Sequence, residues 1–107
     1  MVKHIVMFKL KEEFNGKTAM ENAAEARARA ERLRDLVPSV VKMKAVCNAP
    51  AADGTNYELA LICDFQDMEG LNAYQNHPEH VKFGAFISQM RESRACIDYE
   101  YEASESK

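Results

Sequence analysis

An alternating pattern at the start of the chain predicts a β-strand over residues 2–10. Its even positions carry the more apolar set, which is Val2, His4, Val6, Phe8 and Leu10. The odd positions carry Lys3, Ile5, Met7 and Lys9. A period of two places each set on its own face of the strand. Residues 40–47, 57–65 and 95–101 are three further predicted strands, and in 57–65 the apolar side chains again occupy alternate positions.

Two helices are predicted between these strands. Thr18-Ala-Met-Glu21 fits a capping box at the start of a helix that ends before Pro38. The expected buried stripe of this helix is Met20, Ala23, Ala24, Arg27, Ala30, Leu33 and Val37. A second helix, capped by Asp67, extends to about Asn76 and resumes after Pro78 over residues 79–91. Residues 11–17 and 48–56 are predicted connections.

The order of these elements is βαββαβ, which is typical of the ferredoxin-like α+β fold. We expect a four-stranded antiparallel sheet with both helices on one face. Residues 1–102 would form one domain, and residues 103–107 a polar C-terminal tail.

The sheet face away from the helices would carry an apolar centre. Ile5, Met7, Ala60 and Ile62 fall on that face, with charged residues at its margins. A second copy packed against it would bury this patch, so we predict a homodimer. A monomer with a half-polar open sheet is the alternative, because antiparallel sheets often leave one face to solvent.

Composition and charge limit the kinds of partner that this protein can be expected to bind. The formal net charge is −3 with both signs interspersed, which argues against nucleic-acid binding. No apolar run could cross a membrane, and the N-terminal segment alternates like a strand rather than a leader peptide, so we expect a cytoplasmic protein. The three cysteines, an odd number, are expected to be reduced thiols.

Three segments together resemble the stress-responsive A/B barrel (Dabb) family. They are the opening MVKHIVMFKLK, the strand at 57–65, and residues 74–81, YQNHPEHV. The resemblance covers nearly the whole chain, and it implies a dimeric α/β barrel made by two sheets facing each other. Members include proteins without known activity, stress-associated plant proteins and a cofactor-free polyketide cyclase.

His4, Tyr74 and His80 are the candidate site. His4 is on the strand face toward the helices, and the break at His77-Pro78 could turn Tyr74 and His80 toward it. The resemblance to the cyclase implies catalytic roles for Tyr74 and His80. Histidine can remove a proton beside a carbonyl, and a tyrosine hydroxyl can donate to the resulting enolate. Alternatively, these side chains only fill the core or cap helix ends.

We therefore predict first a pocket for a small apolar or aromatic molecule, with His4, Tyr74, His77, His80 and Phe83 as its ligand-binding residues. A cofactor-independent enzyme and a structural protein without ligand are the alternatives. No flavin, nucleotide or catalytic-metal motif is present in the sequence, so no cofactor is expected. His77 and His80 are too few for a transition-metal site. The family resemblance also implies a weak cation site of main-chain carbonyls at Arg34, Val37 and Val40.

Overall fold

The computed structural model describes residues 1–103 and contains the predicted elements in the predicted order. The strands are β1 (Val2–Leu10), β2 (Glu13–Phe14), β3 (Lys17–Thr18), β4 (Lys42–Cys47), β5 (Leu59–Phe65) and β6 (Arg91–Glu100). The helices are α1 (Ala19–Glu31), α2 (Leu33–Leu36), α3 (Met68–Asn76) and α4 (Pro78–Met90). Apart from Ala103, the predicted polar tail lies outside the described residues.

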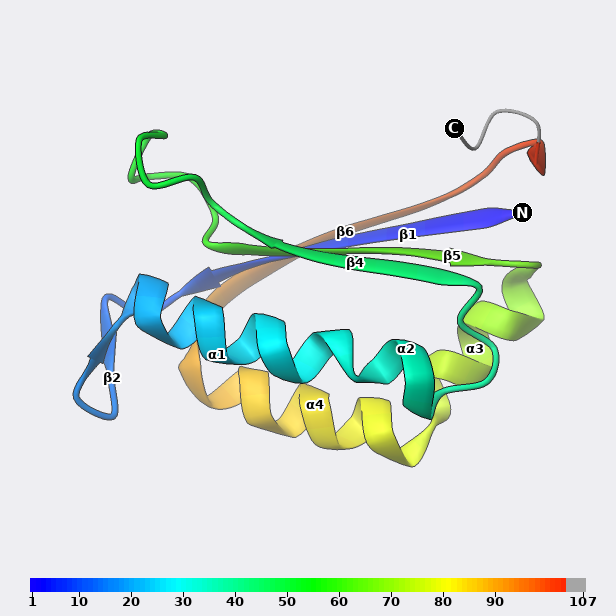
Figure 1. The fold of residues 1–107 in the computed structure, drawn as a ribbon, viewed down its shortest axis with the longest axis horizontal. Coiled ribbons are helices and arrows are strands. Elements are labelled where there is room, and N and C mark those ends of the chain that lie inside the picture. The colour runs from blue at the N-terminus through cyan, green and yellow to red at the C-terminus, as the bar shows by residue number, and fades with distance from the viewer. Residues whose placement is uncertain (104–107) are drawn as a thin grey trace.

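The main sheet has the strand order β4-β5-β1-β6, and every neighbouring pair is antiparallel. This is the ferredoxin-like topology, as predicted. β1 is a central strand, pairing Val2 with Phe65 on one side and with Glu100 on the other. Figure 1 shows the helices gathered beneath one face of the sheet, with its other face uncovered.

The core lies between the sheet and the helices. The even positions of β1 and the odd positions of β5 face it, and both sets are buried. This confirms the face predicted from alternation. Within residues 1–103, no helix is both long and apolar enough to cross a bilayer.

The first helix begins as predicted but buries a different stripe. Thr18 Oγ1 accepts from the Glu21 amide at 3.2 Å, and Glu21 Oε1 accepts from the Thr18 amide at 2.9 Å. The predicted positions Met20, Ala24 and Arg27 are exposed. The buried positions are Asn22, Ala23, Ala26, Ala30, Leu33 and Val37. Alanine recurs so often in this segment that spacing alone does not distinguish its faces.

The predicted connection at residues 11–17 contains a two-stranded hairpin. Asn15 and Gly16 have φ angles of 57° and 79° between β2 and β3. Positive φ at both central residues is the geometry that an Asn-Gly hairpin turn requires. The side-chain amide of Asn22 donates to the Phe14 carbonyl at 3.1 Å, which holds the hairpin against α1.

His77 separates α3 from α4. Its amide donates to the Tyr74 carbonyl at 3.1 Å, and its Nδ1 accepts from the Glu79 amide at 3.1 Å. Pro78 occupies the first position of α4, where a missing amide hydrogen is tolerated. His77 therefore ends one helix and caps the next.

Replacing His77 with alanine is expected to lower the free energy of unfolding by about 1 kcal/mol, because the α4 start loses its side-chain acceptor. Chemical denaturation would measure the change. His77→Asn, which retains an acceptor, should recover most of it. Equal stability of the wild type and His77→Ala would contradict the capping role.

The face of the sheet away from the helices has an apolar centre. Met7, Ile97 and Tyr99 are exposed there, beside the half-buried Ile5 and Ile62. Ion pairs at its margins join Lys3 to Asp64 at 3.4 Å and Lys9 to Glu58 at 2.9 Å. The predicted apolar strip on β1 and β5 therefore lies on one face, and β6 extends it. We refer to Ile5, Met7, Ala60, Ile62, Ile97 and Tyr99 as the open sheet face.

Candidate functional site

A cavity of about 110 Å³ lies between the helix-facing side of the sheet and the broken helix. His4 on β1 lines it, together with Tyr74 on α3 and His80 at the start of α4. The remaining walls are mainly apolar, and Arg91 and Arg94 of β6 also border it. The structure therefore brings together the three side chains predicted from sequence, and Phe83 with them.

His4 is held by the last strand of the sheet. It is buried, and its Nδ1 lies 2.5 Å from Oδ1 of Asp98, its register partner on β6. A carboxylate only accepts, so the hydrogen is on Nδ1 and the lone pair of a neutral His4 ring is on Nε2. Asp98 thus fixes both the orientation and the tautomer of the imidazole.

His80 is oriented in a similar way by the main chain. Its Nδ1 donates to the Gln75 carbonyl at 3.1 Å, so Nε2 is again the basic nitrogen. Burial lowers the pKa of His80, and the nearby His4 and Arg94 add to this effect, although the Gln75 bond opposes it. His80 is therefore a neutral base at neutral pH.

Tyr74 lies between the two histidines. Its ring centroid is 4.4 Å from that of His80 and 6.2 Å from that of His4. Burial raises the pKa of Tyr74 far above its ordinary value, with a further contribution from Cys63. Burial also raises the pKa of Cys63, to about 12. Tyr74 therefore stays protonated and can act as a hydrogen-bond donor but not as a base. Its hydroxyl interacts with the Cys63 thiol here.

The other residues predicted to bind a ligand or a cation lie outside this cavity. His77 caps α4 and is not among the residues that line the cavity. Arg34 lies in α2, Val37 at its C-terminal end, and Val40 in the following loop. The Val37 carbonyl already accepts from the Val40 amide at 3.2 Å. A cation site at these carbonyls stays a prediction.

Sequence reasoning missed the contribution of β6. Asp98 and Arg94 lie on the side of β6 that faces the site, and so does Cys96, whose Sγ is 3.5 Å from His4 Nδ1. Within residues 1–103, His4, Cys96 and Asp98 are the group whose possible metal-binding atoms converge, all within 4.8 Å. The alternation of residues 94, 96 and 98 would have placed them on one face. Only the register of β6 against β1 brings them to His4.

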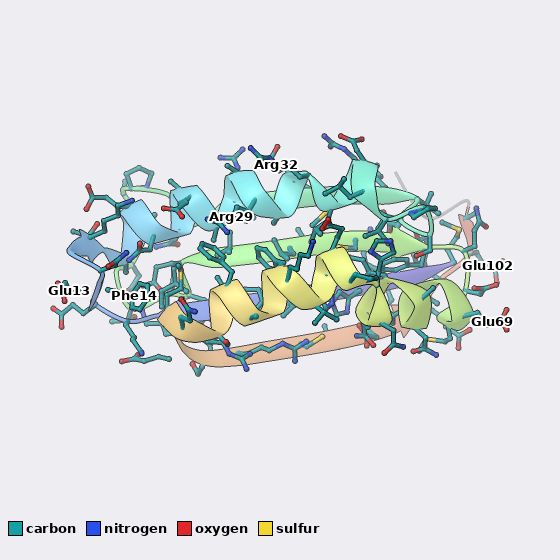
Figure 2. All side chains as sticks on the ribbon, turned by 90° about the horizontal axis from the view of Figure 1, so that it is seen from below. Glu13, Phe14, Arg29, Arg32, Glu69 and Glu102 are labelled. Atoms are coloured by element: carbon teal, nitrogen blue, oxygen red, sulfur yellow. The ribbon has the colours of Figure 1, made fainter. Side chains whose placement is uncertain are left out.

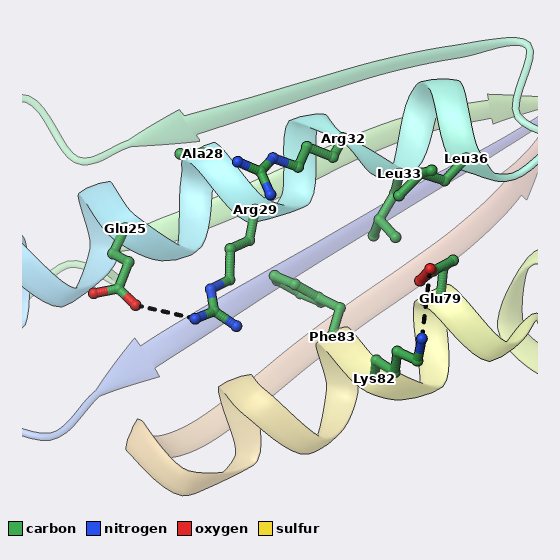
Figure 3. A pocket seen from close by; sticks show the side chains of 9 residues that line it. All are labelled: Glu25, Ala28, Arg29, Arg32, Leu33, Leu36, Glu79, Lys82 and Phe83. Atoms are coloured by element: carbon green, nitrogen blue, oxygen red, sulfur yellow. Dashed lines mark ion pairs between the residues drawn. The ribbon is translucent and has the colours of Figure 1, made fainter.

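A larger and more open groove, of about 410 Å³, runs over the outside of the helix layer. Figure 3 shows Phe83 between the helices, with Arg29 and Arg32 on one side and the Glu79–Lys82 pair on the other. Phe83 borders both this groove and the inner cavity. The groove is larger, but it lacks the fixed histidines, so we place the candidate site in the inner cavity.

Comparison with known protein families decides the family. The model of the stress responsive A/B barrel domain (Dabb) matches residues 2–101. The chain belongs to the Dabb family. A comparison with curated proteins found no match.

Solved structures agree with this assignment. The Dabb domain is similar to a dimeric ferredoxin-like protein of unknown function from Bacteroides fragilis, with 31% identity, 94% and 95% of the two chains covered and a TM-score of 0.82. A dabb family protein from Mesorhizobium loti has 22% identity, 95% and 97% coverage and a TM-score of 0.68. The hydroxynitrile lyase of Passiflora edulis shares the fold at 16% identity, with 95% and 88% coverage and a TM-score of 0.75.

Proposed function

We propose that this Dabb domain acts as a homodimer and binds a small apolar or aromatic molecule that carries a hydrogen-bonding oxygen. The observation that carries this proposal is the cavity between sheet and broken helix, which has apolar walls and polar groups from His4, Tyr74 and His80. Small-molecule sites combine mainly apolar walls with a few fixed polar groups in this way.

The volume of the cavity limits the size of the ligand. An apolar cavity of about 150 Å³ is enough to hold benzene, and this one has about 110 Å³. Drug-sized ligands occupy roughly 300–1,000 Å³. The favoured ligand is therefore about the size of a single six-membered ring with one small oxygen-bearing group. A larger one requires Phe83 to move, because Phe83 stands between the cavity and the outer groove.

The polar groups favour an oxygen on that ligand. Tyr74 offers a hydroxyl donor, and Arg94 contributes a positive charge at the border of the cavity. The neutral His80 offers a lone pair at Nε2. A carbonyl or phenol oxygen satisfies these groups better than a hydrocarbon, because buried polar groups left without partners are costly.

The dimer follows from the open sheet face and from the relatives. A contiguous apolar patch at the centre of a sheet is typical of an interface. The Bacteroides fragilis protein, at 31% identity, is described as dimeric. A face-to-face pairing of two sheets would cover Ile97 and Met7 and leave the cavity on the opposite side of each sheet.

Filling the cavity at Gly84 is expected to abolish ligand binding. A Cβ built at Gly84 meets nothing within 4 Å, and this residue lines the cavity, so the first carbon of a larger side chain is accommodated and the rest of a leucine would occupy the space of the ligand. The probes would be phenol, benzaldehyde and cyclohexanone, followed by NMR shifts of the Tyr74 and Gly84 amides. We expect shifts of the amides of Tyr74 and residue 84 in the wild type and none in Gly84→Leu.

Ala85→Leu is the matched control, because residue 85 is exposed on the same helix. It should bind as the wild type does. Gly84→Ala should also raise the stability by about 1 kcal/mol, because glycine is unfavourable within a helix. If all three probes leave the wild type unshifted, or shift Gly84→Leu equally, the binding proposal fails.

A second candidate function, cofactor-independent catalysis, is favoured by the fixed tautomer of His80. Its Nε2 would remove a proton beside a carbonyl, and Tyr74, turned from Cys63 to the substrate, would donate to the enolate oxygen. The proton then returns from His80 to the product carbon or to a leaving group. The hydroxynitrile lyase from Passiflora edulis supports the idea that this fold can contain an enzyme site, although its 16% identity carries only the fold.

A further inference from the structure

We propose that His4, Cys96 and Asp98 bind a divalent transition-metal ion of the zinc class on the helix-facing side of β6. Their ligand atoms, Nδ1, Sγ and Oδ1, all lie within 4.8 Å of one another. Imidazole nitrogen, thiolate sulfur and carboxylate oxygen are the donor types that zinc uses in proteins. This site is separate from the ligand cavity proposed above, although His4 borders both.

The spacing of the three atoms is close to that of a tetrahedral site. With typical zinc–ligand distances, tetrahedral geometry puts nitrogen and sulfur about 3.6 Å apart, sulfur and oxygen about 3.6 Å, and nitrogen and oxygen about 3.3 Å. Here Nδ1 is 3.5 Å from Sγ, and Sγ is 3.8 Å from Oδ1. Only the Nδ1–Oδ1 separation, 2.5 Å, must open, by about 0.8 Å. The Asp98 side chain is 33% exposed, so we expect it to rotate by this amount.

The sheet fixes the ligands before any metal arrives. His4 and Asp98 are register partners on β1 and β6, and Cys96, two residues before Asp98, has its side chain on the same face. His4 is buried and anchored in a central strand, whereas Cys96 is exposed and the Asp98 side chain is 33% exposed. A cation can therefore approach from solvent. His4 would be the rigid ligand, and Cys96 and Asp98 could adjust to the ion. Three ligands leave a fourth position for water or another small ligand.

The surrounding charge favours a cation once the thiol has lost its proton. Thiolate Cys96 and carboxylate Asp98 provide two negative charges, against the single positive charge of Arg94 two residues away. Metal binding at Nδ1 requires the His4 hydrogen that now points to Asp98 to move to Nε2, so that the ring stays neutral, and the Cys96 thiol proton is released to solvent.

The position of β6 keeps the site open. Figure 2 shows β6 running alongside α4 at the border of the sheet, with α1 on the far side of α4. Cys96 faces away from the open sheet face that we assign to the dimer, because Ile97 occupies that face. Cys96 does not line the ligand cavity, so its substitution separates metal binding from small-molecule binding, whereas Asp98 also orients His4 in that cavity.

The test is a Co²⁺ titration of the reduced full chain, followed by optical absorption. We expect one Co²⁺ per chain, the intense visible bands of a tetrahedral site, and a thiolate-to-cobalt charge-transfer band that added Zn²⁺ removes. Cys96→Ser should lose the charge-transfer band completely. Asp98→Asn should weaken Co²⁺ binding at least about tenfold. Cys47→Ser, which alters a half-buried thiol on β4, should behave as the wild type does.

Absence of a charge-transfer band in the wild type would overturn the proposal. So would the same band and stoichiometry in Cys96→Ser, because the thiolate would then come from another cysteine. The test does not depend on a substrate or on Gly84, so its failure would leave the ligand-binding proposal intact, and the converse also holds.

Discussion

Replacing Ile97 with lysine is expected to convert the dimer into a monomer. Ile97 is 60% exposed in the single chain and lies opposite Ile5, in the middle of the open sheet face. In the proposed dimer, the new ammonium group would be buried without a partner. An uncompensated buried charge costs about 4 kcal/mol, and each copy brings one to the interface, so association should weaken at least about a thousandfold.

Sedimentation equilibrium at micromolar concentration would measure this effect. The wild type should sediment at twice the chain mass of 12.1 kDa, and Ile97→Lys at the chain mass. Val81→Lys is the matched control, because Val81 is also a β-branched residue, is 56% exposed, and lies on α4 in the helix layer. It should remain dimeric. A dimeric Ile97→Lys, or a monomeric wild type, would refute the predicted interface.

If the chain is an enzyme, His80→Ala is expected to lower turnover of a small β-keto substrate by about 10²–10⁴-fold. The reason is the loss of the Nε2 lone pair that the bond from Nδ1 to Gln75 fixes. Tyr74→Phe should cost roughly 10²–10³-fold, since it removes the donor to the developing enolate. Steady-state kinetics on folded dimers would measure both losses. Full turnover by His80→Ala would exclude His80 as the base.

The dependence of this rate on pH tests separately whether neutral His80 is the base. The pKa of His80 is lowered from 6.5, so its neutral, basic form predominates at neutral pH, and the rate should decline only under acidic conditions. The same shift has a consequence for stability. As pH falls below 6.5, the unfolded chain takes up the proton first, so the contribution of neutral His80 to stability is progressively lost. His77→Ala should leave the rate nearly unchanged while still lowering stability.

Local patterns were sufficient to predict most of the fold. Alternation placed β1 and β5, and the capping box at Thr18 placed the start of α1. The pattern did not predict the buried face of α1 correctly. Alanines lie on several faces of this helix, so their spacing did not show that Ala26 is buried and Ala24 is exposed. The Asn15-Gly16 hairpin was overlooked because the flanking strands have only two residues each.

The candidate site was predictable only in part, and for a similar reason. His4, Tyr74 and His80 could be inferred from local face and helix-break arguments together with the family resemblance. Asp98 could not be inferred, because the sequence around residue 98 does not indicate that it pairs with His4. That pairing depends on the register of β6, and Leu10 pairs with Arg91 across an irregularity of the ladder. Long-range register is a property of the assembled sheet and is not encoded in any short segment.

The central position of β1 has a consequence for the order in which the molecule folds. β1 is made before the other strands of the main sheet, and its partners β5 and β6 follow about half a chain length and nearly a whole chain length later. Sheets held by such distant pairings fold slowly, because long loops must close first. The pairing of His4 with Asp98 spans 94 positions, so the histidine stays unanchored during synthesis until β6 has docked. The candidate site is therefore incomplete until β6 has been synthesised and paired with β1, and a nascent chain without β6 would contain His4 but not the Asp98 that orients it.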